Sequence, residues 1–144
     1  LRLSRGLGDV YKRQVVNLLD ATPFIPVIAP IGIGEDFKTY NINADIVAGK
    51  IAKILQAGKY VVLTNTTGIF DDNGNLIKSM NAEQVRQLVN KGIISSGMLP
   101  KVESALEAVS AGVQNVQIID GTIDHAILLE LFTDEGVGTM IRRT

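Results

Sequence analysis

The sequence predicts an α/β fold, a three-layer αβα sandwich in which a mainly parallel sheet is covered by helices on both faces. Two observations lead to this fold class. Short apolar runs typical of buried strands alternate along the chain with stretches of helical periodicity. The composition, 46% hydrophobic but only 5% aromatic, indicates an interior filled by aliphatic side chains. A chain of 144 residues is long enough for one packed domain.

The first 14 residues differ from the rest. They carry Arg2, Arg5, Lys12 and Arg13, begin without methionine and show no sustained helix or strand period. We expect residues 1–14 to be a non-native junction segment, with an ordinary chain end as the alternative. The domain is expected to span residues 15–144.

The first half of the domain shows two apolar runs and one amphipathic stretch. In the amphipathic stretch Ile46, Val47, Ile51, Ile54 and Leu55 recur near helical spacing, and Gly58 is placed to end the helix. The predicted elements are the end of a helix at 15–19, a buried strand at 25–29, a turn at 30–34, a helix at 44–56 and a buried strand at 60–64.

The second half is punctuated by turn and cap residues. The sequence Asp-Asp-Asn-Gly-Asn at 71–75 predicts a hairpin turn, and Asn81 can cap a helix that points Val85 inward. The predicted elements are a hairpin over 69–77, helices at 82–91 and 99–110 (ended by Gly112), a strand at 116–120, a short helix at 126–132 and a closing strand at 138–141.

Composition and charge argue against several function classes. The net charge is −1, so no basic footprint indicates a nucleic-acid partner. No run of about 18 apolar residues is present, so we expect no membrane span. The absence of cysteine excludes disulfides and thiolate chemistry and favours the cytoplasm. The Gly-x-Gly at 32–34 lacks the third glycine of a dinucleotide-binding loop.

The predicted sheet places three loops at its ligand-binding edge. In open α/β sheets ligands collect outside the carboxyl ends of the strands. The loops at 30–45, 65–68 and 120–124 are therefore the candidate binding segments.

Lys101 is the first candidate for chemistry. Pro100 suits the opening turn of a helix, which puts Lys101 where the helix dipole disfavours a cation. A lysine there is explained if an anion such as phosphate also binds the N–H groups of the helix start. A solvated surface lysine is the alternative.

A second polar group precedes the helix at 44–56. Asn43 can be its N-cap and Asp45 a first-turn carboxylate, which leaves Asn41 and Tyr40 unexplained. The functional alternative is that Asp45 holds the Lys101 ammonium while the Asn41 amide orients a substrate carbonyl.

A metal site is not predicted. His125 is the only histidine, so neither a histidine cluster nor a triad with a second histidine is available. The acidic residues from position 120 onward have no ligand spacing; they are Asp120, Asp124, Glu130, Asp134 and Glu135.

Four segments together carry a resemblance to a known family. They are Tyr-Asn-Ile-Asn-Ala-Asp at 40–45, Leu-Thr through Gly-Ile at 63–69, Gly-Met-Leu-Pro-Lys-Val at 97–102 and Thr-Asp-Glu-Gly-Val-Gly-Thr-Met-Ile at 133–141. In this order, over residues 15–144, the sequence resembles the acetylglutamate kinases of the amino acid kinase family.

The resemblance implies the C-terminal, nucleotide-binding part of the amino acid kinase fold. It implies ATP-dependent phosphorylation, with Mg²⁺, of the side-chain carboxylate of N-acetyl-L-glutamate in arginine biosynthesis. It also implies a cytoplasmic or plastid enzyme that is a homo-oligomer when full length, with arginine as a feedback inhibitor.

The same resemblance assigns roles residue by residue. Lys101 matches the lysine that stabilises the transferring phosphoryl group, Asp45 the carboxylate that organises the catalytic lysines, and Asn41 a contact to acetylglutamate. His125 and Glu130 fall in the arginine-binding region. The matches to the nucleotide-binding region are Asn65, Thr66, Thr67, Gly68, Ile69, Phe70, Ile93, Ile94 and Ser95.

Two departures from the family pattern affect these expectations. Asn65 stands where the family usually has aspartate, which removes a charge beside the nucleotide. The family's N-terminal half, with a second catalytic lysine, a glycine-rich phosphate loop and the substrate-binding Gly-Gly and arginine, has no counterpart here. We therefore expect a nucleotide-side fragment with little or no activity alone.

Three alternatives remain open. The chain belongs to another amino acid kinase, of the glutamate or carbamate type; or it is a non-catalytic arginine-binding α/β module; or it is an inert truncated product with an uncovered sheet edge.

Overall fold

The computed structural model describes residues 23, 25–133 and 136–143. The junction expected at 1–14 and the helix end expected at 15–19 lie outside these residues. In chain order the described elements are β1 (Ile31–Ile33), β2 (Thr39–Asn41), α2 (Ala44–Leu55), β3 (Lys59–Thr64), β4 (Ser79–Asn81), α3 (Ala82–Asn90), α4 (Leu99–Ser110), β5 (Asn115–Asp120), α5 (Ala126–Phe132) and β6 (Thr139–Arg142).

The main sheet has the strand order β3-β5-β6-β4. β3 runs parallel to β5 and β4 parallel to β6, whereas β5 and β6 are antiparallel. The prediction of an α/β fold with a mainly parallel sheet is confirmed. Within the described part of the chain β3 pairs on one side alone, so it forms an edge of the sheet.

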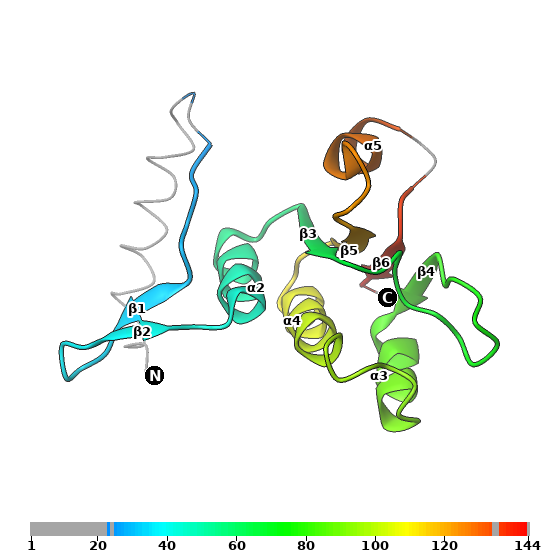
Figure 1. The fold of residues 1–144 in the computed structure, drawn as a ribbon, viewed down its shortest axis with the longest axis horizontal. Coiled ribbons are helices and arrows are strands. Elements are labelled where there is room, and N and C mark those ends of the chain that lie inside the picture. The colour runs from blue at the N-terminus through cyan, green and yellow to red at the C-terminus, as the bar shows by residue number, and fades with distance from the viewer. Residues whose placement is uncertain (1–22, 24, 134–135, 144) are drawn as a thin grey trace.

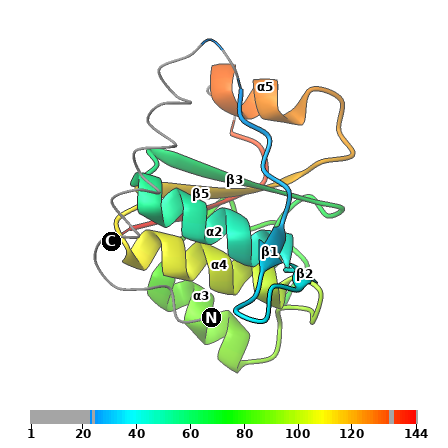
Figure 2. The same cartoon turned by 90° about the vertical axis from the view of Figure 1, so that its left-hand side faces the viewer.

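The helices lie in two unequal layers. Figure 2 shows α2, α3 and α4 on one face of the sheet and α5 on the other. The fully buried side chains between the sheet and the three helices are aliphatic, as the composition predicts; they include Val85, Val102, Val109, Val116, Ile118 and Ile141. This core fixes α4 beneath β3, β5 and β6.

Local cap chemistry explains where α3 begins. The Asn81 side chain accepts from the Gln84 N–H and the Gln84 side chain accepts from the Asn81 N–H, which forms a capping box. The predicted cap at Asn81 is confirmed.

Gly58 does not end α2, contrary to expectation: the helix ends at Leu55, and Gln56 adopts the left-handed conformation with φ 51°. The Gln56 side chain makes this possible because its amide donates to the Lys53 and Ala111 carbonyls.

The buried strand predicted at 25–29 is wrong. These residues form no strand, and Ile25 and Val27 are 90% and 94% exposed. An apolar run becomes a buried strand only where a neighbouring strand and a covering layer exist, and no described strand pairs with it. Pro26 and Pro30 also remove N–H donors that a ladder would need.

The turn predicted at 30–34 is also wrong, because Ile31–Ile33 forms strand β1. β1 pairs with β2 in a separate antiparallel ribbon. The turn lies further along, where the Gly34 N–H donates to the Lys38 carbonyl and the Asp36 carboxylate accepts from the Lys38 N–H and the Tyr40 hydroxyl. Tyr40, unexplained from the sequence, thus closes the turn of this ribbon.

The hairpin predicted over 69–77 is confirmed. Phe70 bridges Leu76 in the antiparallel sense, and the Asp71 carboxylate accepts from the N–H groups of Asn73 and Asn75. The buried Thr139 of β6 ties the hairpin to the sheet: its hydroxyl accepts from the Ile69 N–H at 2.8 Å and donates to the Ile77 carbonyl at 2.7 Å.

In the described part of the chain no helix is long and apolar enough to cross a membrane.

Candidate functional site

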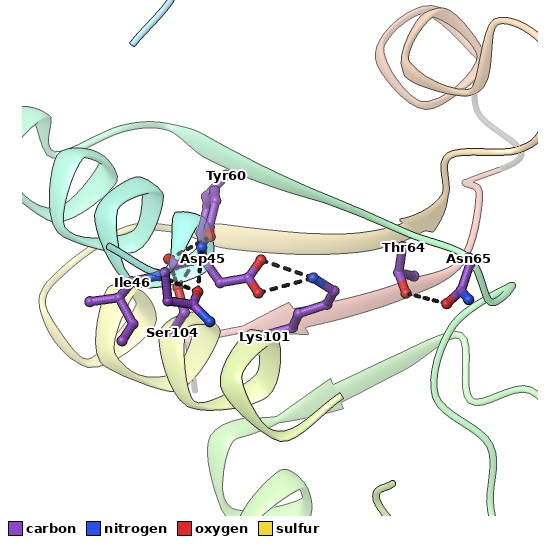
Figure 3. Close-up of polar contacts among 8 residues, drawn as sticks. Asp45, Ile46, Tyr60, Thr64, Asn65, Lys101 and Ser104 are labelled. Atoms are coloured by element: carbon purple, nitrogen blue, oxygen red, sulfur yellow. Dashed lines mark hydrogen bonds and ion pairs between the residues drawn. The ribbon is translucent and has the colours of Figure 1, made fainter. Parts of the chain in front are cut away.

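Asp45 and Lys101 meet where α2 and α4 begin. The Lys101 ammonium donates to both carboxylate oxygens of Asp45 at 3.0 Å, as Figure 3 shows. The two side chains are 21% and 19% exposed, so the pair is partly withdrawn from water and still reachable from solvent. The structure therefore brings together the two residues predicted to be catalytic, and it excludes the alternative of an unpaired surface lysine.

Each partner is positioned by the start of its own helix. The Asn43 side chain accepts from the N–H groups of Asp45 and Ile46, which confirms the predicted N-cap and sets Asp45 in the first turn of α2. Pro100 occupies the first turn of α4 and leaves Lys101 one residue further along. The Asp45 carboxylate supplies the anion that a lysine in this unfavourable position requires.

The start of α4 offers fewer free N–H groups than the sequence suggests. Met98 and Leu99 both donate to the Ser95 carbonyl, and Val102 donates to the Met98 carbonyl. Pro100 has no N–H. An anion at this helix end would thus depend on the Lys101 side chain more than on backbone donors.

Two buried hydroxyl groups hold the backbone of Asp45, and the sequence does not indicate them. Ser104 of α4 donates to the Asp45 carbonyl oxygen at 2.7 Å, the Tyr60 hydroxyl of β3 lies 3.3 Å from the same oxygen, and the two hydroxyls are 3.1 Å apart. Burial raises the pKa of Tyr60 and outweighs the opposite effect of its hydrogen bond with Ser104. The only sequence signal is that Ser104 lies three residues after Lys101, on the same side of a helix.

A pocket of about 200 Å³ lies at the carboxyl end of β3, beside the hairpin and the start of α4. Its lining residues are Thr66, Gly68, Ile69, Phe70, Asp71, Ile93, Ile94, Ser95 and Met98. Most of the predicted nucleotide-binding residues are therefore gathered around one pocket, while Asn65 and Thr67 are not among the lining. Asp71 and Met98 were missed by sequence reasoning. Because Met98 is the N-cap of α4, the pocket borders the helix end that carries Lys101.

The loops after β3 and β5 meet at the same sheet edge. The Gly121 N–H donates to the Thr64 carbonyl at 2.7 Å. Asn65 is exposed, and its side-chain oxygen accepts from the Thr64 hydroxyl at 3.5 Å. Hydrogen bonds from the Thr122 hydroxyl and N–H lower the pKa of Asp120, so this carboxylate is occupied within its own loop. Asn41 is the last residue of β2, four residues before Asp45, and its side chain is exposed.

His125 and Glu130 occupy different surroundings. Glu130 is buried in α5, where its carboxylate accepts from the Lys59 ammonium and from the Val137 N–H. This joins α5 to β3 and to the segment before β6. His125 precedes α5 with an exposed side chain and a left-handed backbone, φ 60°. Among the described residues no group of three histidine, cysteine, aspartate or glutamate side chains could hold a metal ion.

Comparison with known proteins identifies a matching family and similar proteins. The sequence model described as "Amino acid kinase family" matches residues 5–120. The chain is 58% identical over 129 residues to the acetylglutamate kinase of Nitrosococcus oceani, covering 90% of this chain and 43% of that protein. It is 57% identical over 138 residues to the acetylglutamate kinase of Halorhodospira halophila, covering 96% and 46%. The chain thus spans less than half the length of these relatives.

Solved structures share the fold. The N-acetylglutamate synthase of Neisseria gonorrhoeae, complexed with coenzyme A and L-arginine, superposes with a TM-score of 0.82 at 34% identity, covering 91% of this chain and 30% of that one. The carbamate kinase of Giardia lamblia bound to AMP-PNP superposes with a TM-score of 0.60 at 20% identity, covering 77% and 36%, which reflects the fold alone.

Proposed function

Because the chain belongs to the amino acid kinase family, we propose that it supplies the C-terminal, nucleotide-side half of an acetylglutamate kinase. In that reaction a side-chain carboxylate oxygen of N-acetyl-L-glutamate attacks the γ-phosphorus of ATP, the bond from that phosphorus to the β,γ-bridging oxygen breaks, and ADP leaves with those electrons. The products are an acyl phosphate and ADP. We assign this role to residues 15–144.

The observation that carries the proposal is the Asp45–Lys101 pair at the start of α4. A protein catalyses phosphoryl transfer mainly by positioning the reactants and neutralising charge, with little covalent chemistry of its own. A lysine held through both carboxylate oxygens keeps one geometry and retains one N–H for the transferring group. In this proposal Lys101 neutralises charge on that group, and Asp45 is the positioning residue that holds it.

The pocket beside the hairpin fits part of a nucleotide. Ile69, Phe70, Ile93, Ile94 and Met98 give it apolar walls, and Thr66 and Ser95 add hydroxyl groups, as an aromatic base with polar edges requires. Bound Mg²⁺-ATP supplies the phosphoryl group and its counter-charge. The absence of a three-residue cluster of metal-binding side chains among the described residues fits a Mg²⁺ held chiefly by phosphate oxygens.

The remaining assignments follow from the same proposal. Asn41 contacts acetylglutamate through its side-chain amide, from the end of β2 that leads into the Asn43 cap. The chain spans 43% and 46% of the two relatives compared, so the groups assigned here correspond to only part of what those relatives contain. We therefore expect nucleotide binding, with little or no turnover, from this chain alone.

The test is calorimetric titration of Mg-ADP into the 144-residue chain. We expect saturable binding of Mg-ADP and, in a parallel titration with Mg-AMP-PNP, which keeps a γ-phosphoryl group for Lys101 to contact, weaker binding in Lys101→Ala and in Asp45→Ala. Lys53→Ala is the matched control, because Lys53 also joins α2 to α4 through an ion pair, with Glu107, but on the exposed surface. If the folded chain binds no Mg-ADP, or if all three variants behave alike, the nucleotide-side assignment is wrong.

Arginine is proposed as a second ligand, near α5. The support is the 34% identical synthase whose structure contains L-arginine, together with a buried carboxylate in α5. Glu130 already accepts from Lys59 and Val137, so an arginine guanidinium there would have to displace the Lys59 ammonium, and His125 would border it. Arginine binding without Mg-ADP binding would favour the arginine-binding module.

Mg-ADP binding by this half does not distinguish acetylglutamate kinases from glutamate or carbamate kinases, and the acceptor must be tested in the whole enzyme.

A further inference from the structure

The hydroxyl groups of Tyr60 and Ser104, called here the hydroxyl pair, act on the same residue as the Lys101 ammonium but on its backbone. Ser104 donates to the Asp45 carbonyl at 2.7 Å, while Lys101 donates to the Asp45 carboxylate at 3.0 Å. Lys101 and Ser104 are three residues apart on α4, so both contacts come from one side of that helix. Asp45 is thus held at two points by α4.

We propose that Ser104 and Tyr60 are positioning residues for phosphoryl transfer, which set through the Asp45 carbonyl where the Asp45 carboxylate holds the Lys101 ammonium. The inference rests on the proposed function of Lys101 and deepens it. Tyr60 contributes from β3, so the pair ties the start of α2 and the middle of α4 to the sheet.

The direction of the hydrogen bonds supports this role. Ser104 donates its proton to the Asp45 carbonyl, and the Tyr60 hydroxyl lies 3.3 Å from the same carbonyl and 3.1 Å from the Ser104 oxygen. Tyr60 and Ser104 are 8% and 6% exposed, and hydrogen bonds in series strengthen one another in such surroundings. Both hydroxyl groups therefore converge on the Asp45 carbonyl, which restricts the orientation of Asp45.

Stability alone does not explain the choice of these residues. A buried hydroxyl pair contributes little more than two well-packed apolar side chains would, because its hydrogen bonds replace those made to water. Phenylalanine and alanine would fill the same places without a donor to satisfy. A requirement for one orientation of Asp45 accounts for the polar pair.

Gly49 shows how closely the two helices approach at this point. A Cβ atom placed on Gly49 would lie 2.3 Å from the Ser104 oxygen, closer than any side-chain contact allows. The absence of a side chain at this position of α2 lets Ser104 reach the Asp45 carbonyl.

The test measures the Lys101 ammonium by NMR, without nucleotide, in the 144-residue chain labelled with ¹⁵N. The ammonium signal is assigned by its loss in Lys101→Met. In Ser104→Ala and in Tyr60→Phe we expect its protons to exchange with water roughly tenfold faster, the factor expected for one lost hydrogen bond. The matched controls are Ser110→Ala, which removes an exposed hydroxyl from α4, and Tyr40→Phe, and both should leave the exchange unchanged.

Unchanged exchange in folded Ser104→Ala and folded Tyr60→Phe would overturn the proposal. Unfolding of both variants under conditions in which Ser110→Ala is folded would also overturn it, because the hydroxyl pair would then serve the fold as a whole. The readout needs no nucleotide, so a failure of Mg-ADP to bind is scored separately, against the proposed function.

Discussion

Asp45 and Lys101 lie 56 residues apart in the sequence, yet the ammonium of one donates to both carboxylate oxygens of the other. A second ion pair, Lys53 with Glu107 at 3.4 Å, also joins α2 to α4. The first pair is about one-fifth exposed and the second about one-half. The two pairs allow the effect of burial to be measured between the same two helices.

Breaking the inner pair should destabilise the fold more than breaking the outer pair. Asp45→Asn leaves the Lys101 charge without its partner in a partly buried place, and we expect a loss of about 1–3 kcal/mol in the free energy of unfolding. Glu107→Gln should change it by at most about 1 kcal/mol, because exposed ion pairs contribute little. Urea unfolding of both variants measures the difference, and equal losses would contradict it.

Gly49→Ala should separate α2 from α4. In an ordinary helix interior this substitution stabilises by about 1 kcal/mol, but here the new methyl group meets Ser104, and we expect a net loss of about 1–3 kcal/mol. Gly58→Ala is the control, because a Cβ atom there has no atom within 4 Å. Part of the loss should be recovered in Gly49→Ala combined with Ser104→Ala. A stabilised Gly49→Ala variant would mean that the helices do not approach as closely as described.

Thr139→Val should loosen the hairpin that lines the pocket. Valine has the shape of threonine but no hydroxyl, so the Ile69 N–H and the Ile77 carbonyl lose their partner at a buried site. We expect a cost of about 1–3 kcal/mol and faster amide hydrogen exchange at Ile69. Thr133→Val, which removes an exposed hydroxyl bonded to the Leu129 carbonyl, is the comparison and should leave Ile69 protected.

The helix starts that carry Asp45 and Lys101 could be predicted from the sequence because their signals are local. Asn43 is a cap residue and Pro100 a first-turn residue, and each locates one helix start to within a residue. The pairing itself was a hypothesis, because no periodicity tells which two helix starts meet. The resemblance supplied the residues expected to bind nucleotide, and the structure gathers most of them around one pocket.

The hydroxyl pair and the apolar run at 25–29 show what sequence patterns miss. Ser104 on an amphipathic helix looks the same whether it faces solvent or another helix, since its hydroxyl can be satisfied by water. Residues 25–29 have the composition of a buried strand but lack a strand partner within the described residues. In both cases the outcome depends on what packs against the segment, and single-chain periodicity contains no information about it.

Alkaline pH should destabilise the fold through Tyr60. Burial raises the pKa of this phenol above 10.0, so between 10.0 and the folded-state value the folded chain keeps a proton that the unfolded chain releases. Stability is therefore full below 10.0 and falls as the pH rises towards the higher value. Urea unfolding from about pH 9 to about pH 11 should show this fall in the parent and a smaller one in Tyr60→Phe. Tyr40→Phe should behave as the parent does.

Restoring a carboxylate at position 65 should strengthen magnesium-dependent nucleotide binding. Asn65 is exposed just beyond the carboxyl end of β3, where acetylglutamate kinases usually have aspartate. A carboxylate there can bind Mg²⁺ directly or through water, so Asn65→Asp should tighten Mg-ADP binding by roughly tenfold, the size of one charge-assisted contact. Without Mg²⁺ the sign should reverse, because the new charge repels the phosphates. Asn90→Asp, on the exposed end of α3, controls for net charge and should change neither affinity. Equal effects with and without Mg²⁺ would show that position 65 does not lie beside the phosphates.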